Sequence, residues 1–233
     1  EHMCPVAYLS DGSLANGAEP WRLPKVEDLA PIHTSFRTEA EGFAPFLRDE
    51  RLVRPWAVPG TPGLEHRIGG IEKEDVTGNI SYEPENHEHM THTRQAKIDK
   101  IADRLPPAQI DGPPTGDVLI VGWGGTYGAL RQAAHQLRAE GHAVGHLHLR
   151  YLNPLQSNVG ALLARYRRVV VAELNLGQLR SILRDKFLVD ARGLNKIQGK
   201  PFKVREVVEA VRKLLPVPAS REGSGALCTA ARW

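Results

Sequence analysis

The chain has 233 residues, of which 41% are hydrophobic, and its 30 Lys and Arg against 27 Asp and Glu give a formal net charge of +3. A chain of this length holds one large or two small domains, while the balanced charge argues against a nucleic-acid surface and no apolar run approaches the ~20 residues of a membrane span. The two cysteines, Cys4 and Cys228, are too few for an iron–sulfur cluster, which takes about four, and nothing indicates an oxidising compartment, so we expect a cytoplasmic protein.

Residues 1–22 are predicted to be the closing strand and loop of an upstream domain. Residues 6–9 (VAYL) form a short apolar run of strand type, and the Asp-Gly pair that follows is a turn signal. Ligands and interfaces gather at the carboxyl ends of strands in open parallel sheets. Asp11, Asn16 and Glu19 are therefore candidates for an interface or an active-site wall, although an ordinary strand-to-loop exit is the alternative.

Residues 23–114 are rich in Pro, His and Glu and show little periodicity, except for a predicted helix at 91–104. Such a long irregular stretch is uncommon inside a compact domain, so we interpret it as a connector that wraps other domains or subunits.

One segment of this connector, residues 56–73 (WAVPGTPGLEHRIGGIEK), has the composition of a shaped loop. Its glycines permit sharp turns or close approach to a ligand. His66 and Arg67 place two donor groups together, and the planar fork of Arg suits a carboxylate. We interpret this pair as a binding site; a surface loop with an isolated Arg is the alternative.

Another segment, residues 86–92 (NHEHMTH), brings His87, Glu88, His89 and His92 together. Three histidines this close could bind zinc, but the spacing expected of a helical zinc motif is absent. We prefer polar contacts at a domain junction and predict no metal.

From residue 115 to 215 the pattern becomes a regular alternation of strands and helices, which predicts a parallel sheet covered on both faces. A tail at 216–233, rich in Ser, Gly and Ala, is expected to be mobile. The predicted strands are 117–121, 144–149, 168–173 and a short one at 196–198, and the predicted helices are 126–140, 159–166, 176–187 and 204–215.

The segment Gly122–Gly128 (GWGGTYG) follows a strand and opens a helix, where a dinucleotide-binding fingerprint would lie. Its spacing is one residue longer than the usual form, and the next strand ends near Arg150 rather than an acidic residue, which would favour a 2′-phosphate. An NADP site therefore remains an alternative. The preferred interpretation is that the glycines permit a tight turn and close packing of the helix on the sheet.

Glu173 and Asn175 lie where a strand meets a helix. A carboxylate at a strand end commonly faces a site or a subunit contact, so Glu173 is a candidate for an interface or active-site wall. Asn175 is a good helix cap and belongs to the same candidate surface.

Several of these segments resemble the α subunits of 2-oxoacid:ferredoxin oxidoreductases, with the 2-oxoglutarate (KorA-type) branch the most similar. The resemblance runs collinearly over nearly the whole chain, so the chain is expected to be the C-terminal part of a longer α subunit. The segments are SDGSLANGAEPW, PGTPGLEHRIGG, TGNISYEPENHEHM, WGGTYGALRQA, LRYLNPLQSN and VVVAELNLGQL.

The resemblance implies an α/β fold: the end of a thiamine-enzyme pyrimidine-type domain (1–22), the irregular connector (23–114) and a transketolase-C-terminal-like domain with a parallel sheet (115–215). It implies oxidative decarboxylation of a 2-oxoacid to an acyl-CoA, with coenzyme A as co-substrate and ferredoxin as electron acceptor. Thiamine diphosphate, Mg²⁺ and an iron–sulfur cluster are expected mainly in a partner β subunit, which acts with the rest of the α chain. Arg67 and His66 are expected to bind substrate. A non-catalytic scaffold remains the alternative from another class.

Overall fold

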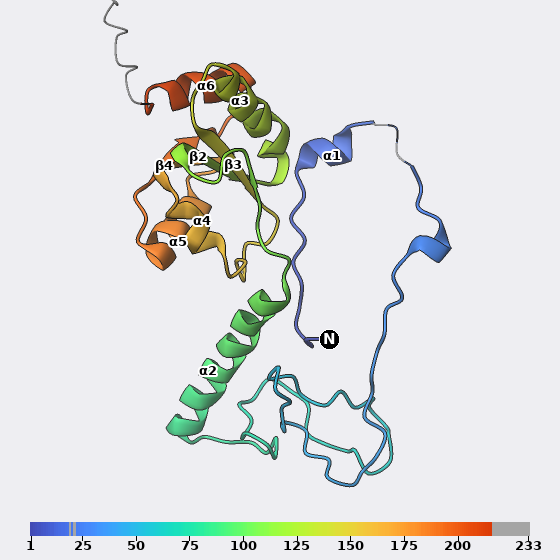
Figure 1. Ribbon diagram of the computed structural model, residues 1–233. Coiled ribbons are helices and arrows are strands. Elements are labelled where there is room, and N and C mark those ends of the chain that lie inside the picture. The colour runs from blue at the N-terminus through green and yellow to red at the C-terminus, as the bar shows by residue number, and fades with distance from the viewer. Residues whose placement is uncertain (19, 21, 216–233) are drawn as a thin grey trace, which may run out of the picture.

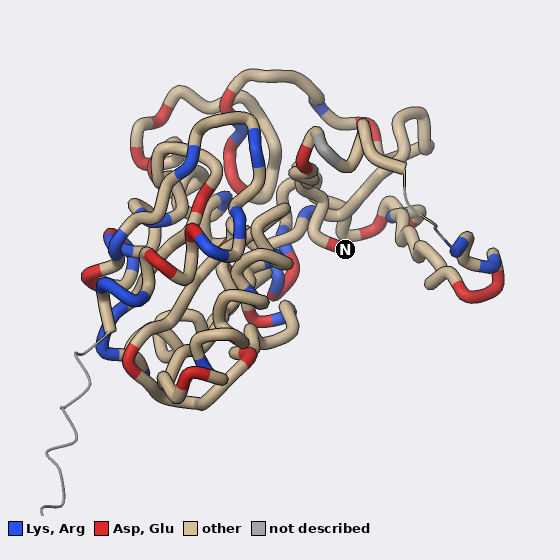
Figure 2. The backbone as a smooth tube through the Cα atoms, turned by 90° about the horizontal axis from the view of Figure 1, so that it is seen from above, with Lys and Arg blue, Asp and Glu red and all other residues tan. Residues whose placement is uncertain are grey.

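The computed structural model describes residues 1–18, 20 and 22–215. Glu19 and the predicted mobile tail at 216–233 lie outside the described residues. In the described part, no helix is long and apolar enough to cross a membrane. Positively and negatively charged residues are interspersed along the backbone, as Figure 2 shows, which agrees with the balanced charge of the sequence.

Five strands form one sheet with the order β1-β3-β2-β4-β5. The four long strands run parallel, and β1 pairs antiparallel with β3 at one edge. The strands are β1 (Ile110–Asp111), β2 (Gly116–Trp123), β3 (Val144–Leu149), β4 (Tyr166–Glu173) and β5 (Ala191–Asn195).

Helices cover both faces of this sheet, so the predicted parallel-sheet architecture is confirmed (Figure 1). Along β2, Val118 and Ile120 pack with α3 and α6, while Leu119 and Val121 pack with α4 and α5. Successive side chains of a strand point to opposite faces, so a strand buried on both faces is hydrophobic throughout. The helices are α3 (Tyr127–Ala139), α4 (Val159–Leu163), α5 (Gln178–Phe187) and α6 (Val204–Arg212).

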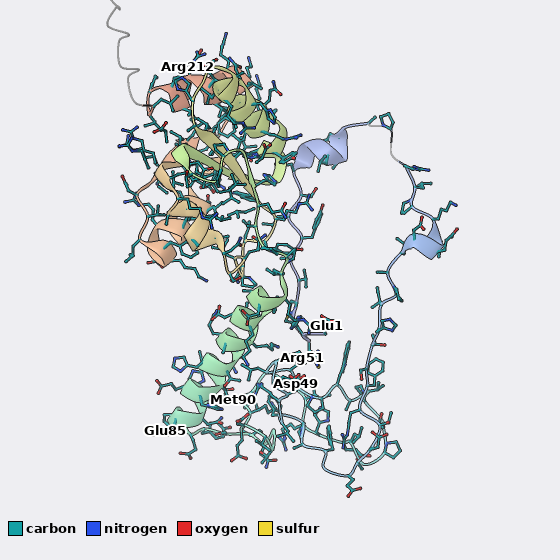
Figure 3. The ribbon with its side chains drawn as sticks, in the orientation of Figure 1. Glu1, Asp49, Arg51, Glu85, Met90 and Arg212 are labelled. Atoms are coloured by element: carbon teal, nitrogen blue, oxygen red, sulfur yellow. The ribbon has the colours of Figure 1, made fainter. Side chains whose placement is uncertain are left out.

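The irregular segment before the sheet folds against α2 (Pro84–Lys100), which continues as a 3-10 turn at Ile101–Arg104 (Figure 3). Met90 of α2 is buried, and its neighbour His89 lies 3.0 Å from Asp75. Arg48 also donates to Asp75 at 3.0 Å. The connector is therefore held on the helix by polar contacts of Arg48 and His89 with the carboxylate of Asp75.

The first residues of the chain run in extended form from α2 to the sheet, as Figure 1 shows, and lead into the short helix α1 (Gly12–Asn16). The Nζ atom of Lys97 donates to the carbonyl of Met3 at 3.1 Å. Further on, Arg37 is fixed by its backbone amide, which donates to the carbonyl of Trp56 at 2.8 Å. The described residues between Asp11 and Arg37, which are 12–18, 20 and 22–36, arch away from the rest of the molecule (Figure 1).

The strand predicted at residues 6–9 was wrong for this structure. These residues are extended but belong to no strand, and Val6 and Tyr8 are 88% and 86% exposed. A strand requires a neighbour that accepts its backbone hydrogen bonds, and none of the described residues pairs with this segment.

Other differences concern where elements begin and end. The sheet includes Ile110–Asp111, which the sequence assigned to the connector, and β5 lies at Ala191–Asn195 instead of the predicted 196–198. Helix α4 ends at Leu163 because the chain enters β4 at Tyr166. Helix α2 begins at Pro84, seven residues before the predicted start at 91, where the fixed φ of proline suits the first turn.

Candidate functional site

A cleft lies at the carboxyl ends of β2, β4 and β5, and we call it the switch-point cleft. Strand β2 is flanked by β3 on one side and by β4 on the other, so the strand order reverses at β2. Open α/β sheets bind ligands at such a point, outside the carboxyl ends of the strands. The cleft consists of two cavities, of about 490 and 170 Å³. They share Asp11, Gly125 and Leu174, and their other lining residues include Asn16, Trp123, Gly124, Thr126, Asn175, Lys196, Lys200 and Pro201.

Asp11 joins the N-terminal segment to the sheet in this cleft. It is the N-cap residue of α1, and its carboxylate accepts a hydrogen bond from the backbone amide of Gly125. Gly125 lies in the turn that leads into α3, and a side chain built on it would collide with the Asp11 carboxylate. Glycine at this position therefore allows the carboxylate to reach the amides at the start of the helix.

This contact disfavours a dinucleotide at the Gly122–Gly128 segment. A cofactor phosphate would use the same helix-terminal amides, but the negative charge of Asp11 already occupies the amide of Gly125. Arg150, the residue considered for a 2′-phosphate, lines a different cavity beside β3.

Glu173 lies behind the cleft, which corrects the prediction that it forms a wall or an interface. Its side chain is fully buried at the end of β4 and accepts hydrogen bonds from the amides of Leu179 and Arg180, each at 2.9 Å. It also accepts a hydrogen bond from Nε1 of Trp123 at 3.4 Å. The N-cap residue of α5 is Gly177, which has no side chain to cap the helix, so Glu173 supplies the missing acceptor and orients Trp123.

Asn175 lines the cleft and caps α5 from the loop before it. Its Oδ1 atom accepts hydrogen bonds from the amides of Gly177 at 2.7 Å and Gln178 at 3.3 Å. Asn175 was predicted as the N-cap, but it lies two residues before the N-cap residue Gly177 and binds the first amides from there. The structure brings it together with Asp11 and Asn16 at one edge of the sheet.

Two lysines of the cleft were missed from the sequence. Lys196 is largely buried and pairs with Glu206 at 2.7 Å, which holds the pKa of that carboxyl below its usual range. Lys200 is exposed at the rim. Both follow β5, and knowing that β5 runs parallel beside β4 would have placed them at the same edge as Asp11.

Arg67 and His66 lie elsewhere. Their segment belongs to the connector, which lies at the end of the molecule opposite the sheet (Figure 1). Arg67 is exposed, while the ring of His66 contacts the carbonyl of Leu64 at 2.8 Å and stacks edge-on against Phe43. The structure thus does not bring this pair together with the residues of the switch-point cleft, and a substrate-binding role for Arg67 stays a prediction.

The histidine-rich turn of α2 makes polar contacts with the connector. His87 lies 2.6 Å from Glu72, and His89 lies 3.0 Å from Asp75. Across residues 1–18, 20 and 22–215, no three His, Cys, Asp or Glu side chains are grouped so that they could hold a metal ion.

The sheet domain matches a known protein family. Residues 116–213 match the family described as Pyruvate:ferredoxin oxidoreductase core domain II. Over 214 residues, 91% of its length, the chain is 50% identical to 2-oxoglutarate oxidoreductase subunit KorA of Mycobacterium tuberculosis, of which it covers 32%. It is 32% identical to 2-oxoacid:ferredoxin oxidoreductase 1, subunit alpha, of Aeropyrum pernix, over 89% of this chain and 34% of that protein.

A solved structure agrees with these relatives. The chain superposes with a TM-score of 0.75 and 30% identity on a 2-oxoglutarate:ferredoxin oxidoreductase from Magnetococcus marinus, solved with 2-oxoglutarate, coenzyme A and succinyl-CoA bound; the match covers 82% of this chain and 34% of that one. The chain is similar over most of its length to the α subunits of 2-oxoacid:ferredoxin oxidoreductases, which confirms the resemblance read from its sequence. It spans about one third of the length of these relatives.

Proposed function

We propose that this chain is part of the α subunit of a cytoplasmic 2-oxoglutarate:ferredoxin oxidoreductase. The complete enzyme would convert a 2-oxoacid and coenzyme A into carbon dioxide and an acyl-CoA, and pass two electrons to ferredoxin. The 50% identity to a 2-oxoglutarate oxidoreductase subunit across 91% of the chain carries this proposal. Its partners would be the rest of the α chain, a β subunit and ferredoxin.

The cofactors of this reaction would be held mainly by the β subunit. Thiamine diphosphate, when bound, supplies a nucleophilic carbon and an electron sink for decarboxylation. The switch-point cleft does not fit its diphosphate, because the carboxylate of Asp11 already occupies the amide of Gly125. The two cysteines of the chain are also fewer than the roughly four that an iron–sulfur cluster takes.

The proposed role of this chain is to bind the substrate and to contact other parts of the enzyme. The switch-point cleft offers carboxamide groups from Asn16 and Asn175 and a cation from Lys200 at one edge of the sheet, which suits a polar contact with another part of the enzyme. Arg67 is exposed on its glycine-rich loop, so in the assembled enzyme its guanidinium is free to hold the distal carboxylate of 2-oxoglutarate, with His66 beside it.

The test is to produce the complete α subunit that contains this chain together with the β subunit. The purified complex should reduce ferredoxin only when 2-oxoglutarate and coenzyme A are both present. A fully assembled complex that shows no turnover with any 2-oxoacid would overturn the proposal. The 233-residue chain assayed alone should be inactive, and turnover by it would contradict the assignment of the cofactors to the β subunit.

A further inference from the structure

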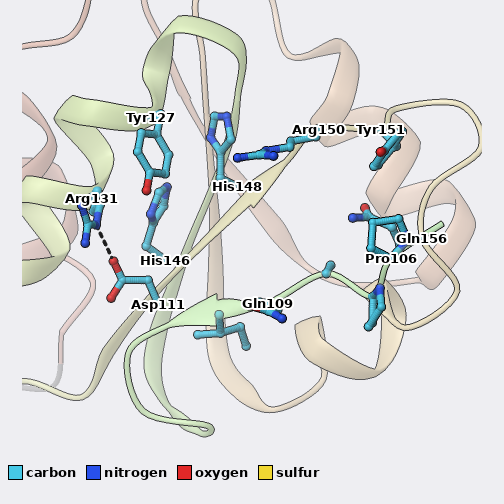
Figure 4. Close-up of a pocket in the computed structure, with 13 residues that line it drawn as sticks. Pro106, Gln109, Asp111, Tyr127, Arg131, His146, His148, Arg150, Tyr151 and Gln156 are labelled. Carbon is cyan, nitrogen blue, oxygen red and sulfur yellow. Dashed lines mark hydrogen bonds and ion pairs between the residues drawn. The ribbon is translucent and has the colours of Figure 1, made fainter. Parts of the chain in front are cut away.

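A separate cavity of about 840 Å³ lies over β1 and the carboxyl half of β3, and we call it the β3 cavity (Figure 4). Its volume falls within the roughly 300–1,000 Å³ of small-molecule sites. It is bounded by β1, the first turn of α3 and the loop after β3, and none of its lining residues belongs to the switch-point cleft. These residues are Pro106, Pro107, Ala108, Gln109, Ile110, Asp111, Tyr127, Arg131, His146, His148, Arg150, Tyr151 and Gln156.

Buried polar atoms without partners line this cavity. His146 is only 1% exposed, and its Nε2 atom has no hydrogen-bond partner among the described residues. The same holds for Nδ1 of His148 and for Oε1 of Gln156, a residue that is 6% exposed. Because buried polar groups in native proteins are nearly always hydrogen-bonded, these three atoms must find their partners among molecules that occupy the cavity, either water or a ligand.

The two imidazoles are held in place by aromatic packing. The ring of Tyr127 lies 5.7 Å from that of His146 and 4.9 Å from that of His148, measured between centroids. Burial lowers the pKa of His146 to about 4 and also lowers the pKa of His148. Both rings are therefore neutral at pH 7, and the Nε2 atom of His146 and the Nδ1 atom of His148 can each donate or accept, depending on the tautomer of the ring.

Positive charge in the cavity comes from Arg150. The carboxylate of Asp111 is neutralised by Arg131 at 2.9 Å and Arg138 at 3.0 Å, whereas Arg150 forms no ion pair with any described residue. Figure 4 shows its guanidinium directed toward His148. A planar guanidinium with free donors favours a phosphate or carboxylate.

The other end of the cavity suits a flat ring. Tyr151 is 39% exposed and lines the cavity together with Gln156 and Pro106, on the same side of it in Figure 4. An exposed tyrosine face and a proline form a surface for stacking, and the Gln156 amide both donates and accepts, as pairing with the edge of a base requires. The ligand therefore combines an anionic group with a flat polar ring.

We propose that the β3 cavity binds a nucleotide, with its phosphate at Arg150 and His148 and its base against Tyr151 and Gln156. The site lies outside the switch-point cleft and does not depend on the proposed oxidoreductase function.

This proposal is tested by titrating the 233-residue chain with AMP. Binding is measured by calorimetry and by the ring-proton NMR signals of the histidines. AMP should bind saturably and shift the signals of His146 and His148. Arg150→Met should weaken binding roughly ten- to a hundredfold, as expected for a lost charge-assisted contact. Arg167→Met is the matched control, because Arg167 is an exposed arginine at the amino end of β4, and it should leave affinity unchanged.

Adenosine and inorganic phosphate serve as partial ligands, and both should bind more weakly than AMP. Equal binding of adenosine and AMP would overturn the phosphate contact, and equal binding of phosphate and AMP would overturn the base contact. The proposal would be overturned if AMP did not bind saturably. If the chain bound only a Glu-rich peptide, the proposal would also be overturned and the cavity would be assigned to a protein partner. Arg150→Met removes an exposed side chain, so the variant should unfold at the same thermal midpoint as the wild type. An unchanged midpoint shows that a loss of binding is not a loss of folding.

Discussion

The carboxylate of Asp11 accepts a hydrogen bond from the backbone amide of Gly125, 114 residues further along the chain. This contact fixes the N-terminal segment at the start of α3 and fills the position where a dinucleotide phosphate would bind. One side chain thus both joins two distant parts of the chain and decides against one of the functions that the glycine-rich turn suggested.

Asp11→Ala is expected to release the N-terminal segment. The lost hydrogen bond to a charged group at a helix terminus should lower the free energy of unfolding by about 1 kcal/mol and speed protease cleavage near residues 6–9. Urea denaturation and timed proteolysis measure both effects. Asp28→Ala, which removes an exposed carboxylate from the same segment, is the control, and equal behaviour of the two variants would contradict a specific role for Asp11.

Glu173→Gln is expected to destabilise the sheet domain by about 2–3 kcal/mol. The amide of Gln accepts with one oxygen only and turns a donor toward backbone amides that also donate, so a buried hydrogen bond is lost. Chemical denaturation followed by tryptophan fluorescence reports the change, because Trp123 also contacts Glu173. Glu209→Gln, on the exposed face of α6, should change stability by less than about 0.5 kcal/mol.

Stability should fall as the pH is lowered through the range set by His146. Its pKa in the folded protein is about 4, below the value of 6.5 for a free imidazole, so the unfolded chain binds the proton more readily. The contribution is fully present above pH 6.5 and is lost as the pH falls toward 4, by up to roughly 3 kcal/mol. Burial is the main cause of the lowered pKa, with His148 second.

Unfolding experiments at pH 7.5 and 4.5 with His146→Gln check this. The variant should lose less stability between the two values than the wild type. His33→Gln, which changes an exposed histidine, should keep the wild-type pH dependence. A His146→Gln variant with the full wild-type dependence would show that other groups cause it.

In the assembled enzyme, Arg67→Met should reduce kcat/KM for 2-oxoglutarate about ten- to a hundredfold. The lost charge-assisted hydrogen bond is worth roughly 1.5–3 kcal/mol, and pyruvate, which lacks the distal carboxylate, should be affected much less. Arg165→Met, another exposed arginine, is the control. An equal loss for both substrates would identify Arg67 as a structural residue of the connector.

The sheet domain could be predicted from the sequence because its strands and helices follow their own periods. Residues 118–121 of β2 are hydrophobic and buried on both faces of the sheet, and α3 carries Leu130, Ala133, Ala134 and Leu137 on one side. The two-residue strand β1 could not be predicted, because its place at the edge of the sheet depends on pairing with β3. The strand expected at residues 6–9 was wrong for the same reason, since a strand is defined by its neighbour.

The candidate site was predicted in part. Asp11, Asn16 and Asn175 were chosen for their places after strands or before helices, and the fold brings them into one cleft. Glu173 had the same signal but turned inward to cap α5, a choice that depends on tertiary packing. The β3 cavity was missed, although His146 and His148 alternate with leucines in β3, and two histidines on one face of a buried strand were a signal that could have been followed.

The arch between Asp11 and Arg37 has a consequence for the order of assembly. It is a loop tied at both ends, by the Gly125 amide on one side and the Trp56 carbonyl on the other. A polypeptide seated inside such a loop can enter or leave only when one tie opens. The rate at which such a polypeptide is released would then depend on how often either of the two hydrogen bonds opens, even where each bond adds little to equilibrium stability.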